Sequence, residues 1–347
     1  MTLPASIRST IPGTLNSVVL VQSDGPIQIN TLNTGSCGSY LALPMDVLGT
    51  EYVVSTWRPA EGESNYFAVI ATEADTVVTI TQFGVPETVT IAQAYLAHFV
   101  LSSDDLTGTT ISSNKPVAVI SGNPGTADDT DYSVSYLWPT ERWGSQHVVA
   151  QIPGSTAAYF VKITSNSQTS TIVRIHGTGR YVLRPGEYLA LEIENRAIYI
   201  ESEAAVQVIQ YTREDMGDGS YSQPSSIVIP ATIRYTTDFF FVTPFQTGTF
   251  QHFITVIIDP TQVSGLLLDT LPVEQTGWEP VVGTDYFVTR SFLVSKQNTF
   301  LNSLCIHTCT GNYNLHNSDV NYTYMYMNAT HTTVWFLMSL SRTQALT

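Results

Sequence analysis

The sequence has few charges and very few cations. Charged residues make up 12% of its 347 residues, and the formal net charge is −15 at pH 7. Lysine occurs only as Lys115, Lys162 and Lys296. Binding to nucleic acid or to an anionic membrane surface depends on clustered lysine and arginine. The composition therefore argues against both kinds of partner.

The chain also lacks a long apolar run and a basic leader. No stretch of about 18 apolar residues occurs, so the sequence predicts no transmembrane segment. The first residues, Met1 to Pro4, have neither the basic nor the apolar region of a signal peptide. Either the protein is cytoplasmic or a leader has been removed. Three cysteines, Cys37, Cys305 and Cys309, leave one over, so disulfides are not expected to be the main source of stability.

The residues that are plentiful suit β-strands. Threonine, serine, tyrosine and valine are common, and short apolar stretches are separated by turn residues. Glu87 to Ile91 alternates, with Val89 and Ile91 on one face, and Gly177 to Gly179 supplies a turn. No window has a convincing helical period. The sequence therefore predicts an all-β fold.

The strongest signal is a repeat. Tyr66-Phe67 recurs as Tyr159-Phe160 (159 − 66 = 93) and as His252-Phe253 (252 − 159 = 93). Repeats of this length are small domains rather than units of a solenoid. We predict three tandem β-sandwich-like repeats of about 93 residues with pseudo-repeat symmetry. The predicted boundaries are 1–43 for an N-terminal strand and arm, 44–138 and 139–229 for the first two repeats, and 230–347 for a divergent third repeat with insertions.

Two further features accompany the repeat. A turn aligns Tyr95 with Tyr188 and, in the third copy, with Gly283 to Tyr286. A closing strand ends each unit, and Ser17 to Gln22 resembles that strand although no unit precedes it. We expect residues 18–21 to dock on the third unit and close the array, since open edge strands promote aggregation. The polar arms between units should form the contacts between neighbours.

Three strand-and-turn phrases occur in one order in the first half of the chain. They are Tyr66 to Ile80, Ile111 to Gly122 and Trp138-Pro-Thr-Glu-Arg-Trp-Gly144. Together they resemble the N-terminal domain of the IgG Fc-binding protein family, over about Tyr40 to Tyr211. The resemblance implies a secreted or surface protein of mucus, extracellular coats or adhesion that binds and assembles rather than catalyses. Better-known members carry cysteines in the loop at 122–132, and this chain has none there. That difference argues against a disulfide-reinforced role in mucus, and Fc binding is assigned to no residue.

Two acidic loops are the candidate metal sites. One contains Asp128, Asp129 and Asp131, and the other contains Asp215 and Asp218. Calcium prefers several carboxylate and carbonyl oxygens that converge from one loop. Neither loop has the spacing of an EF-hand, and solvated turns are the alternative, because aspartate favours turns. We predict no obligatory cofactor, and calcium is the ion that these loops would suit.

An alternating tyrosine ladder is the candidate binding surface. Tyr322, Tyr324 and Tyr326 share one face of a predicted strand. Such a ladder could bind a partner, since tyrosine is enriched in interface cores. The alternatives are core packing or an edge covered by the N-terminal strand.

The remaining candidates are two cysteines and two asparagines near the C-terminal end. Cys305 and Cys309 are expected to form a disulfide or to remain buried thiols, because a zinc site needs a second pair and only Cys37 is left. Asn321 and Asn328 each begin a glycosylation sequon. Two sequons in a chain rich in asparagine and threonine say little about secretion.

The sequence contains no hydrolase signature, neither Gly-x-Ser-x-Gly nor His-Glu-x-x-His. The leading prediction is an extracellular structural or adhesive protein, without catalysis, that binds other proteins or glycans or assembles with itself. The second is an enzyme or small-molecule binder that uses a cleft between repeats, where pockets often form. The third is a calcium-stiffened module of a larger filament.

Overall fold

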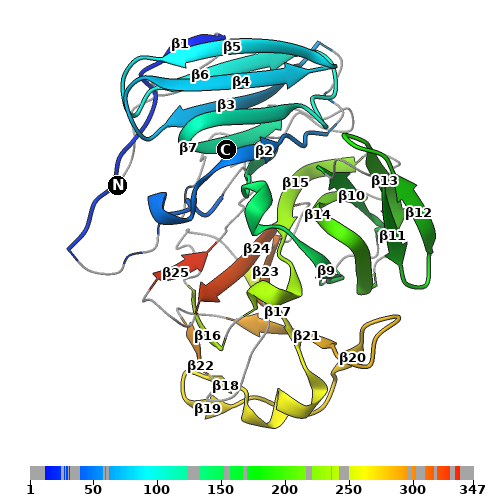
Figure 1. The fold of residues 1–347 in the computed structure, drawn as a ribbon. Helices are drawn as coiled ribbons and strands as arrows, with labels where there is room; N and C mark the ends of the chain where they lie inside the picture. Colours follow the sequence, from blue (N-terminus) through cyan, green and yellow to red (C-terminus); the bar gives the residue numbers. More distant parts are fainter. Residues whose placement is uncertain are drawn as a thin grey trace, which may run out of the picture.

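The chain is all-β, as predicted. Figure 1 shows its strands in three groups, with β1 to β7 at the top, β9 to β15 at the right and the later strands below them. The helices in the described part are short 3-10 turns: η2 (Met45–Val47), η3 (Thr140–Arg142), η4 (Thr232–Arg234) and η5 (Pro260–Gly265). The computed structural model describes residues 12–24, 27, 29, 31, 40–57, 59, 62–123, 133–151, 153, 157–166, 170–194, 196–215, 221–235, 237–241, 250–294, 298–301, 309–315, 319–328 and 333–336.

The first group is one sheet that curls around a long strand, β7. The strand order is β1-β6-β3-β7-β4-β5, and β2 and β8 also pair with β7. One half of β7 pairs with β3 and the other with β4, so the sheet folds over its own core. Its strands are β1 (Gly13–Leu15), β2 (Gly49–Val53), β3 (Asn65–Ala71), β4 (Thr76–Gln82), β5 (Val85–Ile91), β6 (Ala97–Ser102), β7 (Thr110–Asn123) and β8 (Ser133–Tyr136).

The second group is built in the same way around β14. The order is β12-β11-β14-β10-β13, and β9 and β15 also pair with β14. Along β11 and β13, more buried residues alternate with more exposed ones, as a half-buried sheet requires. Its strands are β9 (Gly144–Val149), β10 (Tyr159–Ser165), β11 (Thr171–Ile175), β12 (Gly179–Leu183), β13 (Tyr188–Ile193), β14 (Ile198–Asp215) and β15 (Tyr221–Ile229).

The third group contains two sheets. One has the order β16-β22-β18-β19 and the other β20-β21-β17-β23-β24-β25. The strands are β16 (Asp238–Phe241), β17 (Phe250–Ile258), β18 (Leu267–Leu268), β19 (Leu271–Pro272), β20 (Glu279–Pro280), β21 (Val288–Val294), β22 (Asn298–Leu301), β23 (Cys309–Leu315), β24 (Asp319–Asn328) and β25 (Thr333–Phe336).

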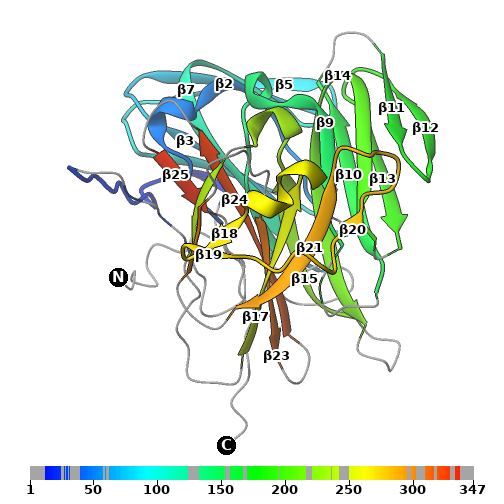
Figure 2. The same ribbon diagram turned by 90° about the horizontal axis from the view of Figure 1, so that it is seen from below.

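The central strand of each group has neighbours in the same order. β3 lies between β6 and β7, β10 between β13 and β14, and β17 between β21 and β23. Each group has one further strand at this end: β8 pairs with β7, β15 with β14 and β24 with β23. β15 also contacts β8 and β24. Ser226 of β15 is hydrogen-bonded to Ser133 and Ser135 of β8, each at 2.8 Å between hydroxyl oxygens. The three groups therefore surround β15 and β24 (Figures 1 and 2).

The arms join neighbouring groups, as predicted. A Cβ on Gly49 would lie 2.6 Å from Cβ of Pro139, and a Cβ on Gly144 would lie 2.4 Å from Cβ of Ala231. The residue before η3 thus packs directly against β2 of the first group, and the residue before η4 packs against β9 of the second. Glycine is required at both junctions because a side chain there would collide with the arm.

The alignment that put Tyr66 level with Tyr159 is wrong. Phe67 and Val161 face the cores of their groups and are fully buried, and these positions are 94 residues apart (161 − 67 = 94). A strand places successive residues on opposite faces, so a slip of one residue reverses every side chain. Tyr66 faces away from the core residue Phe67, whereas Tyr159 is itself a core residue.

The turn alignment is wrong for a related reason. Tyr95 has a φ of 62° and Gly186 a φ of 74°, and both stand just before the strand that pairs with the central strand. The left-handed conformation is a property of this turn, so the counterpart of Tyr95 is Gly186 rather than Tyr188. Matching Tyr95 with Tyr188 by residue type therefore placed the turn of the second group two residues too late.

The N-terminal strand also differs from the prediction. The strand is β1, which pairs with β6 of the first group. Residues 16–23 lie outside any strand, and Val19, Leu20 and Val21 are 39–42% exposed. Docking of residues 18–21 on the third unit is therefore wrong. An apolar run shows that a segment can form a strand, but it does not show which edge will accept it.

Candidate functional site

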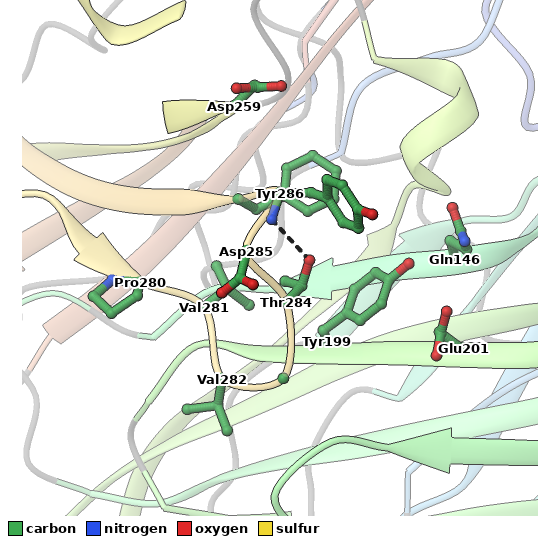
Figure 3. A pocket seen from close by; sticks show the side chains of 12 residues that line it. Gln146, Tyr199, Glu201, Asp259, Pro280, Val281, Val282, Thr284, Asp285 and Tyr286 are labelled. Atoms are coloured by element: carbon green, nitrogen blue, oxygen red, sulfur yellow. Dashed lines mark hydrogen bonds between the residues drawn. The ribbon is translucent and has the colours of Figure 1, made fainter. Parts of the chain in front are cut away.

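A cleft of about 1020 Å³ opens between the second and third groups (Figure 3). One wall comes from β9 and β14, and the other from Asp259 and the segment before β21. The lining residues are Gln146, Tyr199, Glu201, Asp259, Pro280, Val281, Val282, Gly283, Thr284, Asp285, Tyr286 and Phe287.

The loop at 281–287 reaches the second group through a glycine. Gly283 has a φ of +89°, and a Cβ there would lie 2.0 Å from Cβ of His176. Beside it, Val282 forms a parallel bridge with Ile198 of β14. The stretch Gly283 to Tyr286, which the sequence aligned with the turn at Tyr95, therefore docks on the neighbouring group.

Aromatic rings form the floor of the cleft. The ring centroid of Tyr199 lies 5.3 Å from that of His176 and 6.2 Å from that of Phe287. Burial, together with the charge of Glu201, raises the pKa of Tyr199 to about 12. The phenol therefore stays protonated at neutral pH. Tyr286, in contrast, is 72% exposed at the mouth of the cleft.

The described lining is anionic. It contains three carboxylates and no lysine or arginine. Asp259 accepts hydrogen bonds from the backbone N–H and the hydroxyl of Thr261, at 2.8 and 2.6 Å, and Glu201 is hydrogen-bonded to Nε2 of His176 at 2.8 Å. Asp285 is exposed. Within the described residues, no group of three histidine, cysteine, aspartate or glutamate side chains is arranged to hold a metal ion. The cleft thus offers exposed tyrosine and carboxylate side chains to a cationic group.

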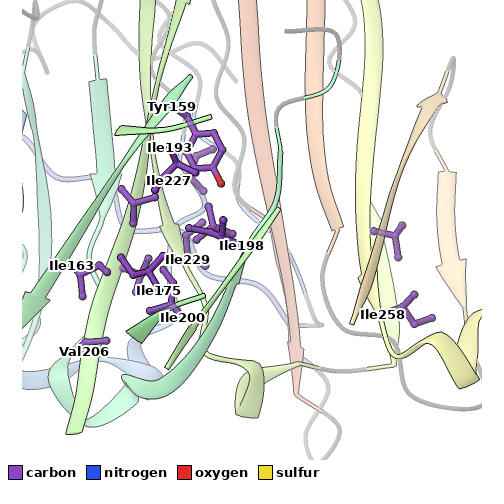
Figure 4. Packing of buried hydrophobic residues seen from close by; sticks show 14 of the residues in the cluster. Tyr159, Ile163, Ile175, Ile193, Ile198, Ile200, Val206, Ile227, Ile229 and Ile258 are labelled. Atoms are coloured by element: carbon purple, nitrogen blue, oxygen red, sulfur yellow. The ribbon is translucent and has the colours of Figure 1, made fainter. Parts of the chain in front are cut away.

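The cleft rests on a rigid core that both groups share. Ile198 and Ile200 of β14 and Ile258 of β17 belong to one cluster of buried side chains, part of which is drawn in Figure 4. Each of these three isoleucines is fully buried. Because the cluster spans both walls, the two groups are held in a fixed relation below the opening.

A second junction, between the first and second groups, is built around Lys162. Its side chain is 3% exposed, and Nζ donates to the carbonyl of Thr56 at 2.6 Å, to Asp105 at 2.6 Å and to the hydroxyl of Thr107 at 2.9 Å. The three acceptors match the three N–H groups of an ammonium ion. Nζ also lies 4.6 Å from the ring centroid of Tyr188 and 5.3 Å from that of Trp57.

The pKa values at this junction reflect two opposing effects. Burial lowers the pKa of Lys162, and the Asp105 carboxylate only partly offsets it. At Asp105 burial acts to raise the pKa, but the charge and hydrogen bond of Lys162 and the bonds from Thr107 outweigh it, so the pKa is lowered. The asymmetry follows from exposure, because the side chain of Asp105 keeps 27% of its surface in water. The desolvation cost falls mainly on the lysine.

The predicted calcium ligands are not tested. Asp215 lies at the end of β14, opposite Tyr221. Asp128, Asp129, Asp131 and Asp218 lie outside the described residues. Calcium binding by these loops stays a prediction.

The tyrosine ladder lies in a strand with neighbours on both sides. Tyr322 stands opposite Asn312 and Tyr324 opposite Thr310 in β23, and Tyr326 stands opposite Trp335 in β25. The suggestion that the N-terminal strand covers this edge is wrong, because β1 pairs with β6. The side chains of β24 lie outside the described part, so partner binding by the ladder stays a prediction.

The cysteines and sequons are placed only in part. Cys309 stands opposite Val256, Asn321 opposite Tyr313 and Asn328 opposite Thr333. Cys37 and Cys305 lie outside the described residues, so the pairing of the cysteines stays open.

Sequence reasoning missed Tyr286 and Lys162. Tyr286 was assigned to a turn. Lys162, one of three lysines and flanked by Val161 and Ile163, could have been noticed, because a lysine in an apolar strand needs a partner.

The fold and the cleft define an all-β protein with a surface suited to binding. The chain belongs to the IgGFc-binding protein family, whose model matches residues 38–326, and the resemblance seen in the sequence is confirmed. It is similar to the human IgGFc-binding protein, with 28% identity over 292 residues, 77% of this chain and 5% of that protein. The chain thus spans about a twentieth of that relative's length.

No solved structure matches the chain. Within the part that the structure describes, no helix has the length and apolar character needed to cross a membrane.

Proposed function

We propose that this chain is a non-catalytic, protein-binding module of an extracellular structural or adhesive protein. Family membership supports a protein partner, because the human relative is named for binding IgG Fc. Glycans or further copies of the chain are the other partners that such a role would allow. Secretion into mucus or an extracellular coat belongs to the same proposal.

The proposed module consists of three repeats, with boundaries at 44–138, 139–229 and 230–347. The shared order of neighbours around β3, β10 and β17 supports this division. The packing of arm residues against Gly49 and Gly144 supports it as well. Small sandwiches joined in this way would present the cleft as a surface between two units.

The cleft is the observation on which the binding proposal rests. An aromatic side chain, Tyr286, stands exposed beside Asp285, in a chain of net charge −15. Exposed tyrosine is typical of interface cores, and a ring beside a carboxylate suits an arginine or lysine of a partner. Excess negative charge also speeds the approach of a cationic surface. The proposed partner is therefore a protein that presents a basic segment.

Binding to immobilised IgG Fc, measured by biolayer interferometry, tests this proposal. Tyr286→Ala should weaken binding about tenfold or more, the loss expected when an aromatic anchor is removed. Phe83→Ala is the matched control, because Phe83 is 65% exposed in the turn between β4 and β5 of the first group. Added salt should also weaken binding, since the attraction is electrostatic. Equal affinities for the two variants would refute the role of the cleft, and absence of binding by the wild-type chain would refute Fc as the partner.

A further inference from the structure

In the part of the chain that the structure describes, one strand edge of the second group is open where the equivalent edges of the other groups are covered. In the first group β1 pairs with β6, and in the third group β20 pairs with β21. The equivalent strand of the second group is β13, which also borders the central strand. Among the described residues β13 pairs with β10 alone. An open edge presents unpaired backbone groups to another strand.

The hydrogen-bond register identifies the open positions. The N–H of Ser165 donates to the carbonyl of Glu187 at 3.2 Å, in the same register as the β10–β13 ladder. In an antiparallel pair such bonds recur at every second residue. The odd-numbered residues of β13 therefore bond to β10, and the backbone groups of Tyr188 and Ala190 point to the free edge. Both residues are also exposed.

The first group shows how such an edge is filled. There the N–H of Ala71 donates to the carbonyl of Leu96 at 3.0 Å, so Ala97 and Phe99 of β6 face the edge. These are the residues that pair with Leu15 and Gly13 of β1. Ala97 and Tyr188 occupy equivalent places at the two edges. Each lies two residues after the turn residue with a positive φ, which is Tyr95 in the first group and Gly186 in the second. An antiparallel strand can therefore lie at this position.

The same chain contains a strand-forming segment that joins no strand. Ser17 to Gln22 reads Ser-Val-Val-Leu-Val-Gln, and it lies outside any strand with Val19, Leu20 and Val21 exposed. It follows β1, which holds it beside the first group, away from β13 (Figure 1). The segment has no charged residue, so its own side chains add no repulsion against the edge of another copy. Its four consecutive apolar residues place apolar side chains on both faces of a strand, so one face could cover Leu189 and Leu191, which are only partly buried.

We propose that the edge of β13 binds the Ser17–Gln22 segment of a second copy of this chain as an added antiparallel strand. Backbone hydrogen bonds at Tyr188 and Ala190 hold the segment, as in other cases of strand addition. The contact joins two different surfaces, so it leaves one segment and one edge free and extends into a chain of copies. This inference deepens the proposed function, because it specifies how the module would assemble.

Two proline variants block the two surfaces separately. Ala190→Pro removes an N–H from the free edge without removing a bond to β10. Ala190→Ser keeps the N–H and is its control. The double variant Val19→Pro with Leu20→Pro blocks the segment, and the same positions changed to threonine keep a strand-forming segment. The segment lies outside any strand, so its variants leave the described sheets intact even if Ala190→Pro fails to fold.

Sedimentation velocity over a range of concentrations gives the readout. The wild-type chain and both control variants should grow beyond the monomer mass of 38.1 kDa as concentration rises. Each proline variant alone should stay monomeric. A mixture of the two should form a one-to-one dimer and nothing larger, because one partner supplies the only intact edge and the other the only intact segment.

Two results would overturn the inference: a wild-type chain that stays monomeric at all concentrations, or segment-proline variants that associate like the wild type. Either result leaves the protein-binding proposal untouched, because Fc binding through the cleft uses neither β13 nor residues 17–22. Loss of Fc binding with normal self-association would count against Fc binding through the cleft and would leave the strand-addition inference intact.

Discussion

Replacing Lys162 with methionine should destabilise the protein by about 2–4 kcal/mol. Methionine has nearly the length of lysine and no charge, so the change leaves little cavity and isolates the effect of the ammonium group. Removing one partner of a buried ion pair costs about 3–5 kcal/mol, since the other charge is left unpaired. The value here is reduced because Asp105 is 27% exposed and keeps its hydrogen bonds to Thr107 and Tyr188.

Lys115→Met is the matched control. The Lys115 side chain is 31% exposed, and its Nζ donates to the carbonyl of Ala74 at 2.6 Å and lies 3.7 Å from Glu73, whose side chain is 60% exposed. An exposed pair of this kind contributes about 0–1 kcal/mol. Urea unfolding followed by tryptophan fluorescence would report both variants, because Trp57 packs on Phe160 and Tyr211 beside Lys162.

A double-mutant cycle separates the pair from its surroundings. Asp105→Asn in the Lys162→Met background should cost less than in the wild type, since the isolated carboxylate has already lost its counter-ion. If Lys162→Met proves no more destabilising than Lys115→Met, the buried lysine does not hold the first two groups together, and the reasoning fails.

Two further predictions concern packing and pH. Gly283→Ala should lower stability by about 3 kcal/mol, because the new side chain clashes with His176 and the backbone is left-handed. Gly84→Ala is the control: its φ is +81° but the space around it is open, so it should cost about 1 kcal/mol. Thermal melts would compare the two variants, and equal losses would count against the docking of the 281–287 loop. Burial lowers the pKa of His147 to about 3, below the ordinary value of 6.5. The unfolded chain then binds the proton first, so this contribution to stability is present above about pH 6.5 and is lost as pH falls toward 3. His147→Leu should flatten that slope in urea midpoints, and an unchanged slope would exclude His147 as its cause.

The fold class was predictable because strands have a local signature. Alternation in Glu87 to Ile91 and turn residues such as Gly177 to Gly179 need no tertiary context. The family resemblance was equally visible in the phrases at 66–80 and 138–144. The equivalence of Tyr66 with Tyr159 failed because similar letters were matched without regard to face. Which residue faces the core depends on how the strand packs.

The candidate site was less predictable. Tyr286 and Asp285 looked like ordinary turn residues, and the cleft that they line forms only where the loop meets β14 of another group. Lys162 was visible as a lysine between apolar residues, but its partners Thr56 and Asp105 lie far away in the sequence. Long-range contacts of this kind have no local signature.

The sequence by itself determined that this protein is built from short strands, that it carries a large negative charge and that it resembles the IgGFc-binding proteins. The strand content follows from the two-residue period of a strand and the charge from composition, whereas the family resemblance lies in the phrases at 66–80, 111–122 and 138–144. Only the tertiary structure decided which strands share an edge, where a cleft opens and that, among the described residues, β13 pairs on one side only. The physical reason is that such features depend on contacts between units, which no single stretch of sequence encodes.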